Sequence, residues 1–171
     1  MNYETIIYEK IGPVGVITLN RPDRLNALSR KLYSELNDAV YSLESDESIS
    51  VLVLTGSGEK AFSAGGDIHE MAEFAKTGNQ PEPESEKEQY PWRIGSCKKP
   101  TIGALNGLAY GGAAVLSSSL DIRIGCERTK FRFLAVSYGR VNSTWSLPMQ
   151  VGWPVAKELL FTGRVVESEE A

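Results

Sequence analysis

The sequence predicts an α/β protein, because one local pattern occurs twice along the chain. In each copy an apolar segment typical of a buried strand is followed by a glycine-containing turn and then by a helix that begins among small residues. The first copy joins VLVL (51–54) to AGGD (64–67), and the second joins TIGAL (101–105) to YGGA (110–113). The unbroken apolar run at 51–54 is also typical of a strand covered on both faces, as in a parallel sheet.

Length and composition limit the class of protein. The 171 residues predict a single domain over 1–171. The net charge of −4 argues against a nucleic-acid or membrane-surface partner. The N-terminus lacks the apolar core of a signal peptide, and no apolar run is long enough to span a membrane, so we expect a cytoplasmic protein. Cys97 and Cys126 are expected to be free thiols, and the single histidine, His69, excludes a multi-histidine metal site, so no metal is expected.

The N-terminal part predicts two strands, a loop and a helix. The strands, at 4–12 and 14–20, are separated by the turn residues Gly12 and Pro13. After a loop, Ser29 is placed to cap a helix over about 30–44. One face of that helix is apolar and consists of Leu32, Leu36, Ala39, Val40 and Leu43. After the strand at 51–54, a second helix is expected from about Asp67 to Lys76.

The remaining elements alternate in the same way. Residues 77–89 are polar and acidic and predict a surface loop, and a short helix is expected through Trp92 and Ile94 to Cys97. A strand at 101–105, a glycine turn at 107–112 and a helix at 113–119 form the second copy of the pattern. Two short strands follow in DIRIGC (121–126) and KFRF (130–133), and a final helix is expected over about 155–162.

The two glycine turns together predict a binding site. Ala64-Gly65-Gly66 and Gly111-Gly112 each precede a helix, whose first N–H groups have no partner within the helix and carry partial positive charge. If the two helix starts face each other, their N–H groups can bind one carbonyl oxygen, such as that of a thioester, and form an oxyanion hole. Glycine leaves room for a ligand there. Alternatively, each turn is only a tight connection between a strand and a helix.

A dinucleotide-binding domain would also contain strand, glycine turn and helix. However, GSGEKA (56–61) provides only G-x-G, and NGLAYGGA (106–113) does not match G-x-G-x-x-G. No segment matches the phosphate-binding pattern G-x-x-x-x-G-K-[ST]. The sequence therefore argues against nucleotide binding through these motifs.

Four segments in order along the chain resemble the enoyl-CoA hydratase/isomerase (crotonase) family. They are ITLNRPDRLNALS, KAFSAGGDIHEM, KPTIGALNGLAYGGAAVLSSSLDIRIGCERTKFRF and KELLFTGRVVESEEA. The resemblance implies a crotonase-like spiral of ββα units, with two roughly perpendicular sheets surrounded by helices. It also implies homo-oligomers, trimers or hexamers. The family's C-terminal helical region, which helps to build trimers, is expected to be missing after Ala171.

The resemblance also implies an activity and a site. Family members bind acyl-CoA thioesters and stabilise an enolate with two backbone N–H groups, which correspond here to Gly66 and Gly112. CoA enters as part of the substrate, and no other cofactor is implied. The family's CoA-contacting positions correspond to Arg24, Leu25, Ala27, Ala64, Asp67 and Ile68. Arg24 is placed to meet a CoA phosphate, or else is a solvated loop arginine.

The sequence departs from the family where hydration would need its acid and base. The hydratases of the family use two glutamates, which correspond here to Val115 and Ala135, and no neighbouring carboxylate offers a one-residue shift. The following loop, residues 140–148, is about three residues shorter than in the family. Its polar and aromatic residues are expected near the acyl pocket; they are Asn142, Ser143, Thr144 and Trp145.

Three interpretations are therefore open, all with ordinary hydration expected to be weak. The chain is an enzyme with another acid or base, for which Tyr138, His69, Glu70 and the carboxylates of 83–88 are candidates. Alternatively, it catalyses a CoA-ester reaction that needs little acid–base help, such as decarboxylation, in which loss of CO₂ itself generates the enolate. The third interpretation is a non-catalytic protein that binds CoA esters or acts as a scaffold.

Overall fold

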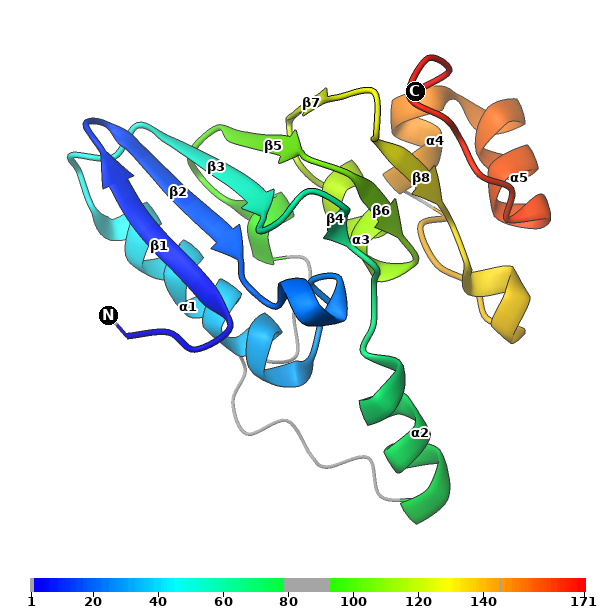
Figure 1. Ribbon diagram of the computed structural model, residues 1–171. Helices are drawn as coiled ribbons and strands as arrows, with labels where there is room; N and C mark the ends of the chain where they lie inside the picture. Colours follow the sequence, from blue (N-terminus) through cyan, green and yellow to red (C-terminus); the bar gives the residue numbers. More distant parts are fainter. Residues whose placement is uncertain (1, 79–92, 145) are drawn as a thin grey trace.

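The computed structural model describes residues 2–78, 93–144 and 146–171, and in these ranges the chain forms two β-sheets with helices around them (Figure 1). The larger sheet has the strand order β1-β2-β3-β5-β7, in which β1 and β2 are antiparallel and the other neighbours are parallel. Its strands are β1 (Ile6–Ile11), β2 (Val14–Leu19), β3 (Val51–Gly56), β5 (Thr101–Leu105) and β7 (Ile122–Gly125). The α/β prediction and the parallel placement of residues 51–54 are confirmed.

The smaller sheet is parallel, with the strand order β4-β6-β8. Its strands are β4 (Ala61–Ser63), β6 (Leu108–Tyr110) and β8 (Lys130–Arg132). The chain therefore repeats one scheme, in which a strand of the large sheet is followed by a strand of the small sheet and then by helical structure. The scheme gives β3-β4-α2 (α2, Ile68–Thr77) and β5-β6-α3 (α3, Gly112–Ser118), and β7-β8 leads into the short 3₁₀ helix η4 (Ala135–Tyr138).

Helix α1 (Arg30–Ser45) agrees with the prediction both in its N-terminal cap and in its buried face. The Ser29 side chain accepts a hydrogen bond from the N–H of Leu32 at 3.2 Å, which satisfies one of the free donors at the helix start. All the residues of the predicted apolar face are at most 2% exposed, and they pack into the main core together with residues of β2 and β3. Figure 1 shows α1 lying along one face of the large sheet, beside β1 and β2.

Several short elements differ from the predictions. The strands β4 and β6 were not predicted, and the segment 107–112 is therefore a strand with turns at its ends rather than one long turn. The expected short helix is a 3₁₀ helix, η3 (Arg93–Ser96), while Trp92 and the acidic loop lie outside the described residues. Helix α5 (Trp153–Thr162) starts two residues early because Pro154 fits its first turn, and α4 (Ser146–Val151) precedes it.

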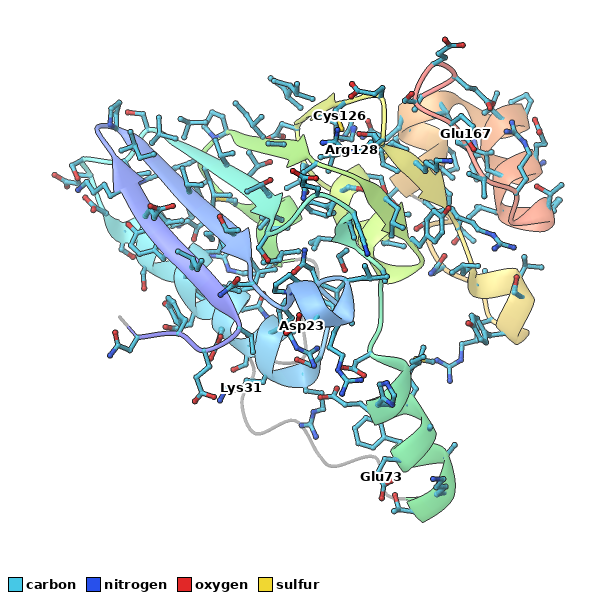
Figure 2. All side chains as sticks on the ribbon, in the orientation of Figure 1. Asp23, Lys31, Glu73, Cys126, Arg128 and Glu167 are labelled. Atoms are coloured by element: carbon cyan, nitrogen blue, oxygen red, sulfur yellow. The ribbon has the colours of Figure 1, made fainter. Side chains whose placement is uncertain are left out.

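Helix α2 projects from the molecule beyond its first turn (Figure 1). None of its residues is buried, and Figure 1 shows it extending away from both sheets. Glu73, on this helix, is correspondingly far from the sheets in Figure 2. In the described ranges, no helix is both long and apolar enough to cross a membrane.

Candidate functional site

The loop before α1 is hydrogen-bonded to the first glycine turn. The N–H of Ala64 donates to the Leu25 carbonyl at 2.9 Å, and the N–H of Leu28 donates to the Gly65 carbonyl at 2.7 Å. The Leu28 carbonyl in turn accepts from the N–H of Asp67 at 3.3 Å. Leu28 thus bonds to the residues on either side of Gly66, and this ladder leaves the N–H of Gly66 unused.

Gly65 is the residue that allows the first turn to approach the second. Its φ of +90° lies in the region that favours glycine. A Cβ at this position would come within 2.4 Å of the Tyr110 carbonyl oxygen and 3.0 Å of the Gly112 nitrogen. The backbones of the two turns are therefore in direct contact. Any side chain larger than the hydrogen of glycine at position 65 would prevent this contact.

Asn26 fixes the loop from inside. Its side chain is completely buried, and its backbone has a φ of +54°. Its Nδ2 donates to the carbonyls of Ser57 at 2.9 Å and Ala61 at 3.0 Å, while its Oδ1 accepts from the N–H of Arg21 at 2.9 Å. Sequence reasoning missed this residue, and its position inside the motif RLNALS was the only sign of its importance.

Asp67 has a structural role through its side chain. Its Oδ1 caps α2 by accepting from the N–H of His69 at 3.0 Å, and its Oδ2 pairs with Arg21 Nη1 at 2.8 Å. Burial by itself would raise the pKa of the Asp67 carboxyl, but the hydrogen bond from Arg21, the N–H of His69 and the Arg21 charge outweigh burial and hold that pKa below its ordinary value.

The depressed pKa predicts how stability depends on pH. The ionised Asp67 contributes stability that is present above its unfolded pKa of about 3.9 and is lost as pH falls through the lower folded value. We expect Asp67→Asn to lower the free energy of unfolding by about 1–3 kcal/mol at pH 7, because it breaks a buried charged hydrogen bond. Urea unfolding of both proteins between pH 7 and pH 2 measures this. A difference that stays constant down to pH 2 would contradict it.

The second glycine turn presents its N–H at the start of α3. Gly111, at φ +53°, donates its N–H to the Arg132 carbonyl at 2.8 Å, which holds the turn on β8. Gly112 is the first residue of α3, so its N–H has no partner inside the helix. In the described ranges, neither the Gly112 nor the Gly66 N–H donates a hydrogen bond.

The two glycines border one small space. A Cβ built on Gly112 would lie 3.7 Å from the Gly66 nitrogen, 3.5 Å from Leu28 Cδ1 and 3.4 Å from the Tyr33 hydroxyl oxygen. Gly66 is solvent-exposed and Gly112 partly so, which leaves the space open to a ligand. An arrangement of two free amides beside an atom-sized space is suited to a carbonyl oxygen on which negative charge develops.

The CoA-contacting positions expected from the resemblance lie in the loop before α1 and around the first glycine turn, and they differ in exposure. Arg24, Leu25 and Ile68 are exposed, whereas Ala27 is buried and Ala64 is partly buried. Arg24 Nη1 lies 2.7 Å from His69 Nε2, so these two candidate residues contact each other on the surface.

The two positions expected from the resemblance to hold glutamates, 115 and 135, have apolar side chains and differ in burial. Val115 is 1% exposed and packs in a second core cluster that includes Phe133 and Leu147. Ala135 begins η4 and is partly buried.

The loop at residues 140–148 contains polar atoms that lack partners among the described residues. Ser143 has a φ of +54° and is 5% exposed. In the part of the chain that the structure describes, Ser143 Oγ and Asn142 Oδ1 are buried without a hydrogen bond. Thr144 is exposed, and Trp145 is outside the described residues.

Three of the candidate acids and bases can be placed. Glu70 Oε2 accepts from the N–H of Arg30 at 3.0 Å and so caps α1, which gives it a structural role. Tyr138 is 60% exposed on η4, and His69 is exposed beside Arg24. The carboxylates of 83–88 lie outside the described residues.

Sequence reasoning also missed Tyr33, whose hydroxyl borders the same space beside Gly112. Tyr33 is in the first turn of α1 and packs partly buried against the main core. Burial raises the pKa of the Tyr33 phenol to about 12. The apolar periodicity of α1 gave no sign of this residue, because Tyr33 does not belong to the predicted face.

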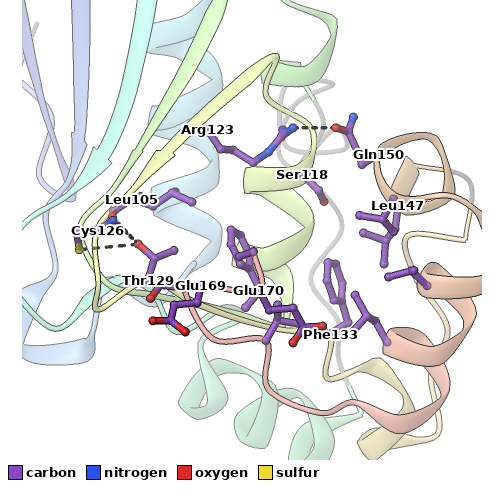
Figure 3. A pocket seen from close by; sticks show the side chains of 18 of the residues that line it. Leu105, Ser118, Arg123, Cys126, Thr129, Phe133, Leu147, Gln150, Glu169 and Glu170 are labelled. Carbon is purple, nitrogen blue, oxygen red and sulfur yellow. Dashed lines mark hydrogen bonds between the residues drawn. The ribbon is translucent and has the colours of Figure 1, made fainter.

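The structure also contains a cavity of about 810 Å³ (Figure 3). Its walls come from the β7–β8 region, from α4 and α5 and from the C-terminal segment, and Arg123 bonds to Gln150 at its edge at 2.8 Å. None of the residues predicted to contact CoA or its thioester lines it.

Comparisons with known proteins show which family the chain belongs to. The family model described as enoyl-CoA hydratase/isomerase matches residues 9–171. The chain is 35% identical to a short-chain-enoyl-CoA hydratase of Clostridium acetobutylicum and 37% identical to a crotonyl-CoA hydratase of Syntrophomonas wolfei. In both cases the match covers 100% of this chain and 66% of the relative, so the chain spans about two thirds of these proteins' length.

Solved structures show the same fold. An enoyl-CoA hydratase subunit I from Geobacillus kaustophilus superposes with a TM-score of 0.85 at 37% identity, covering 99% of this chain and 65% of that one. An enoyl-CoA hydratase from Bacillus anthracis gives a TM-score of 0.86 at 30% identity, covering 98% and 66%. With the family model matched over nearly all of its length, the chain belongs to the enoyl-CoA hydratase/isomerase family.

Proposed function

We propose that this chain binds an acyl-CoA thioester, with the carbonyl oxygen held between the N–H groups of Gly66 and Gly112, and stabilises the enolate formed from it. The observation that carries the proposal is the small space beside Gly112, which the Gly66 nitrogen also borders. Both N–H groups lack partners in the described ranges, so each is available to a ligand. One such donor contributes about 3–4 kcal/mol to a transition state that carries negative charge.

The rest of the CoA is proposed to lie over the loop before α1 and the first turn. The expected contacts are exposed there, at Leu25 and Ile68 and at the Arg24 guanidinium, whose fork of donors suits a phosphate. This binding mode needs no cofactor other than the CoA of the substrate. A homo-oligomer in the cytoplasm is part of the same proposal.

The relatives' names would suggest hydration, but two positions favour a different reaction. Hydration needs a group to activate water and another to deliver a proton, and Val115 and Ala135 can do neither. We therefore propose weak hydration and, as the second candidate, an enolate-forming reaction such as decarboxylation or isomerisation. In decarboxylation the C–C bond breaks, CO₂ leaves, and the electron pair becomes the enolate that the two amides hold.

A panel of acyl-CoAs tests this function. We expect the purified chain to bind acyl-CoA by calorimetry, while its crotonyl-CoA hydration is at least about 10³-fold slower than that of a glutamate-containing relative assayed alongside, as loss of acid–base groups predicts. Hydration at the relative's rate would contradict the argument from Val115 and Ala135. Release of CO₂ from a malonyl-type ester supports decarboxylation, and binding without turnover supports the scaffold interpretation. If no acyl-CoA binds, the proposed function is wrong.

A further inference from the structure

We infer that the Tyr33 hydroxyl is a third hydrogen-bond donor to the carbonyl oxygen of the bound thioester, beside the N–H groups of Gly66 and Gly112. The inference rests on the proposed function and adds a residue to the same site. Its starting point is the space beside Gly112: a Cβ there would be 3.4 Å from the Tyr33 hydroxyl oxygen and 3.7 Å from the Gly66 nitrogen. An atom at that point would therefore lie close to the Tyr33 hydroxyl and to the Gly66 nitrogen, beside the backbone of Gly112.

Tyr33 is held in place relative to both turns. Its N–H donates to the Ser29 carbonyl at 3.0 Å in the first turn of α1, directly after the loop that is bonded to Gly65. Glu70, at the start of α2, caps the same end of α1 through the N–H of Arg30. The Tyr33 ring also packs against the main core. Tyr33 thus lies on a helix that begins directly after the loop bonded to the first glycine turn, so a bound oxygen would find the hydroxyl already oriented relative to that turn.

The hydroxyl is free to donate. In the described ranges no hydrogen-bond partner of the Tyr33 hydroxyl is found, and the residue is partly buried. A bound carbonyl oxygen would therefore not have to displace another partner of this hydroxyl. Burial raises the pKa of the phenol to about 12, so at neutral pH the hydroxyl carries its proton and acts as a donor rather than as a base.

A hydroxyl donor would favour the enolate over the neutral thioester. A hydrogen bond to a charged oxygen is stronger than one to a neutral carbonyl, so the contribution of Tyr33 grows as charge develops. No proton is transferred in this role and no covalent bond to Tyr33 forms. The donor would partly offset the absence of carboxylates at positions 115 and 135, because it stabilises the charged state directly.

Tyr33→Phe tests the inference, because it removes the hydroxyl and keeps the ring. The matched control is Tyr8→Phe, which makes the same change at a partly buried tyrosine of the edge strand β1. The readout is the infrared band of the thioester carbonyl in crotonyl-CoA labelled with ¹³C at that carbon. We expect binding to the wild type and to Tyr8→Phe to move the band to lower frequency. With Tyr33→Phe we expect a clearly smaller shift, and about tenfold weaker binding of crotonyl-CoA, corresponding to ~1.4 kcal/mol, with CoA binding unchanged.

The outcomes separate this inference from the proposed function. An equal band shift in wild type and Tyr33→Phe would overturn the role of Tyr33 and leave the two-amide proposal standing. A wild type that binds crotonyl-CoA without any band shift would overturn both. If Tyr33→Phe is too unstable to purify, difluorotyrosine at position 33 replaces it, because its more acidic hydroxyl is a stronger donor. That protein should enlarge the band shift, and an unchanged shift would again overturn the inference.

Discussion

Gly112→Ala should strongly weaken acyl-CoA binding and slow any turnover by about 100-fold or more, the loss of rate typical of a disabled oxyanion hole, while the chain keeps its fold. The new methyl group would stand in the space that borders the Gly66 nitrogen and the Tyr33 hydroxyl, where the carbonyl oxygen is proposed to bind. Its distances to neighbouring atoms, 3.4–3.7 Å, are ordinary van der Waals contacts, so the substitution introduces no clash. Alanine is also a better helix former than glycine at the start of α3.

Gly66→Ala provides the comparison for this variant. Among the described residues, a Cβ on Gly66 would meet only Met71 Sδ, at 3.4 Å, and it leaves the Gly66 N–H in place. Its loss of affinity should therefore be much smaller than that of Gly112→Ala. Calorimetric titration with an acyl-CoA measures both affinities, and thermal melting by circular dichroism checks that both variants are folded. Wild-type affinity in a folded Gly112→Ala protein would show that the carbonyl does not bind between the two turns.

Asn26→Ala should lower the free energy of unfolding by about 3–5 kcal/mol, which is a large share of the stability of a domain of this size. The change leaves the Ser57 carbonyl and the N–H of Arg21 without the bonds that Asn26 gives them. It also forces alanine into a left-handed backbone conformation, which asparagine tolerates better. Because the loop that Asn26 fixes is bonded to the first glycine turn, acyl-CoA binding should weaken as well.

Two further variants separate the causes of the Asn26 effect. Asn26→Gly removes the same side-chain bonds but accepts the left-handed backbone, so it should destabilise less than alanine. Asn20→Ala changes a partly buried asparagine for which the described residues show no side-chain hydrogen bond, and it should cost no more than about 0.5 kcal/mol. Urea unfolding at constant pH gives these values. A cost for Asn26→Ala as small as that for Asn20→Ala would refute the argument.

The regular elements could be predicted where a periodic pattern was long enough. Helix α1 and strands β3 and β5 have strong patterns, and their positions agree with the prediction. The strands β4 and β6 have only three residues each, which is too short for alternation to be distinguished from a turn. These strands form because β4 pairs with β6 and β6 pairs with β8. Pairing between distant segments cannot be predicted from the local sequence pattern.

Some parts of the candidate site could be predicted from the sequence, and others could not. The two glycine turns and the helix starts that follow them could be found from the local sequence, because glycine and capping residues indicate particular backbone conformations. Their contact in space was a hypothesis, and it is the Gly65 backbone that makes the approach possible. Asn26 and Tyr33 could not be assigned, because the role of each depends on residues far away in the sequence. Asn26 bonds to Ser57 and Ala61, which are more than thirty residues away. Tyr33 lies near Gly112.

The contact between the two glycine turns links consecutive ββα units, since one turn belongs to β3-β4-α2 and the other to β5-β6-α3. A thioester held by both amides would act as a clamp between these units and would be absent from the unfolded chain, in which the amides do not meet. Its binding free energy would therefore add to the cohesion of the fold, by about 2.7 kcal/mol when the free ligand is at 100 times its Kd. In this chain, recognition of the substrate and attachment of one structural unit to the next would depend on the same few atoms.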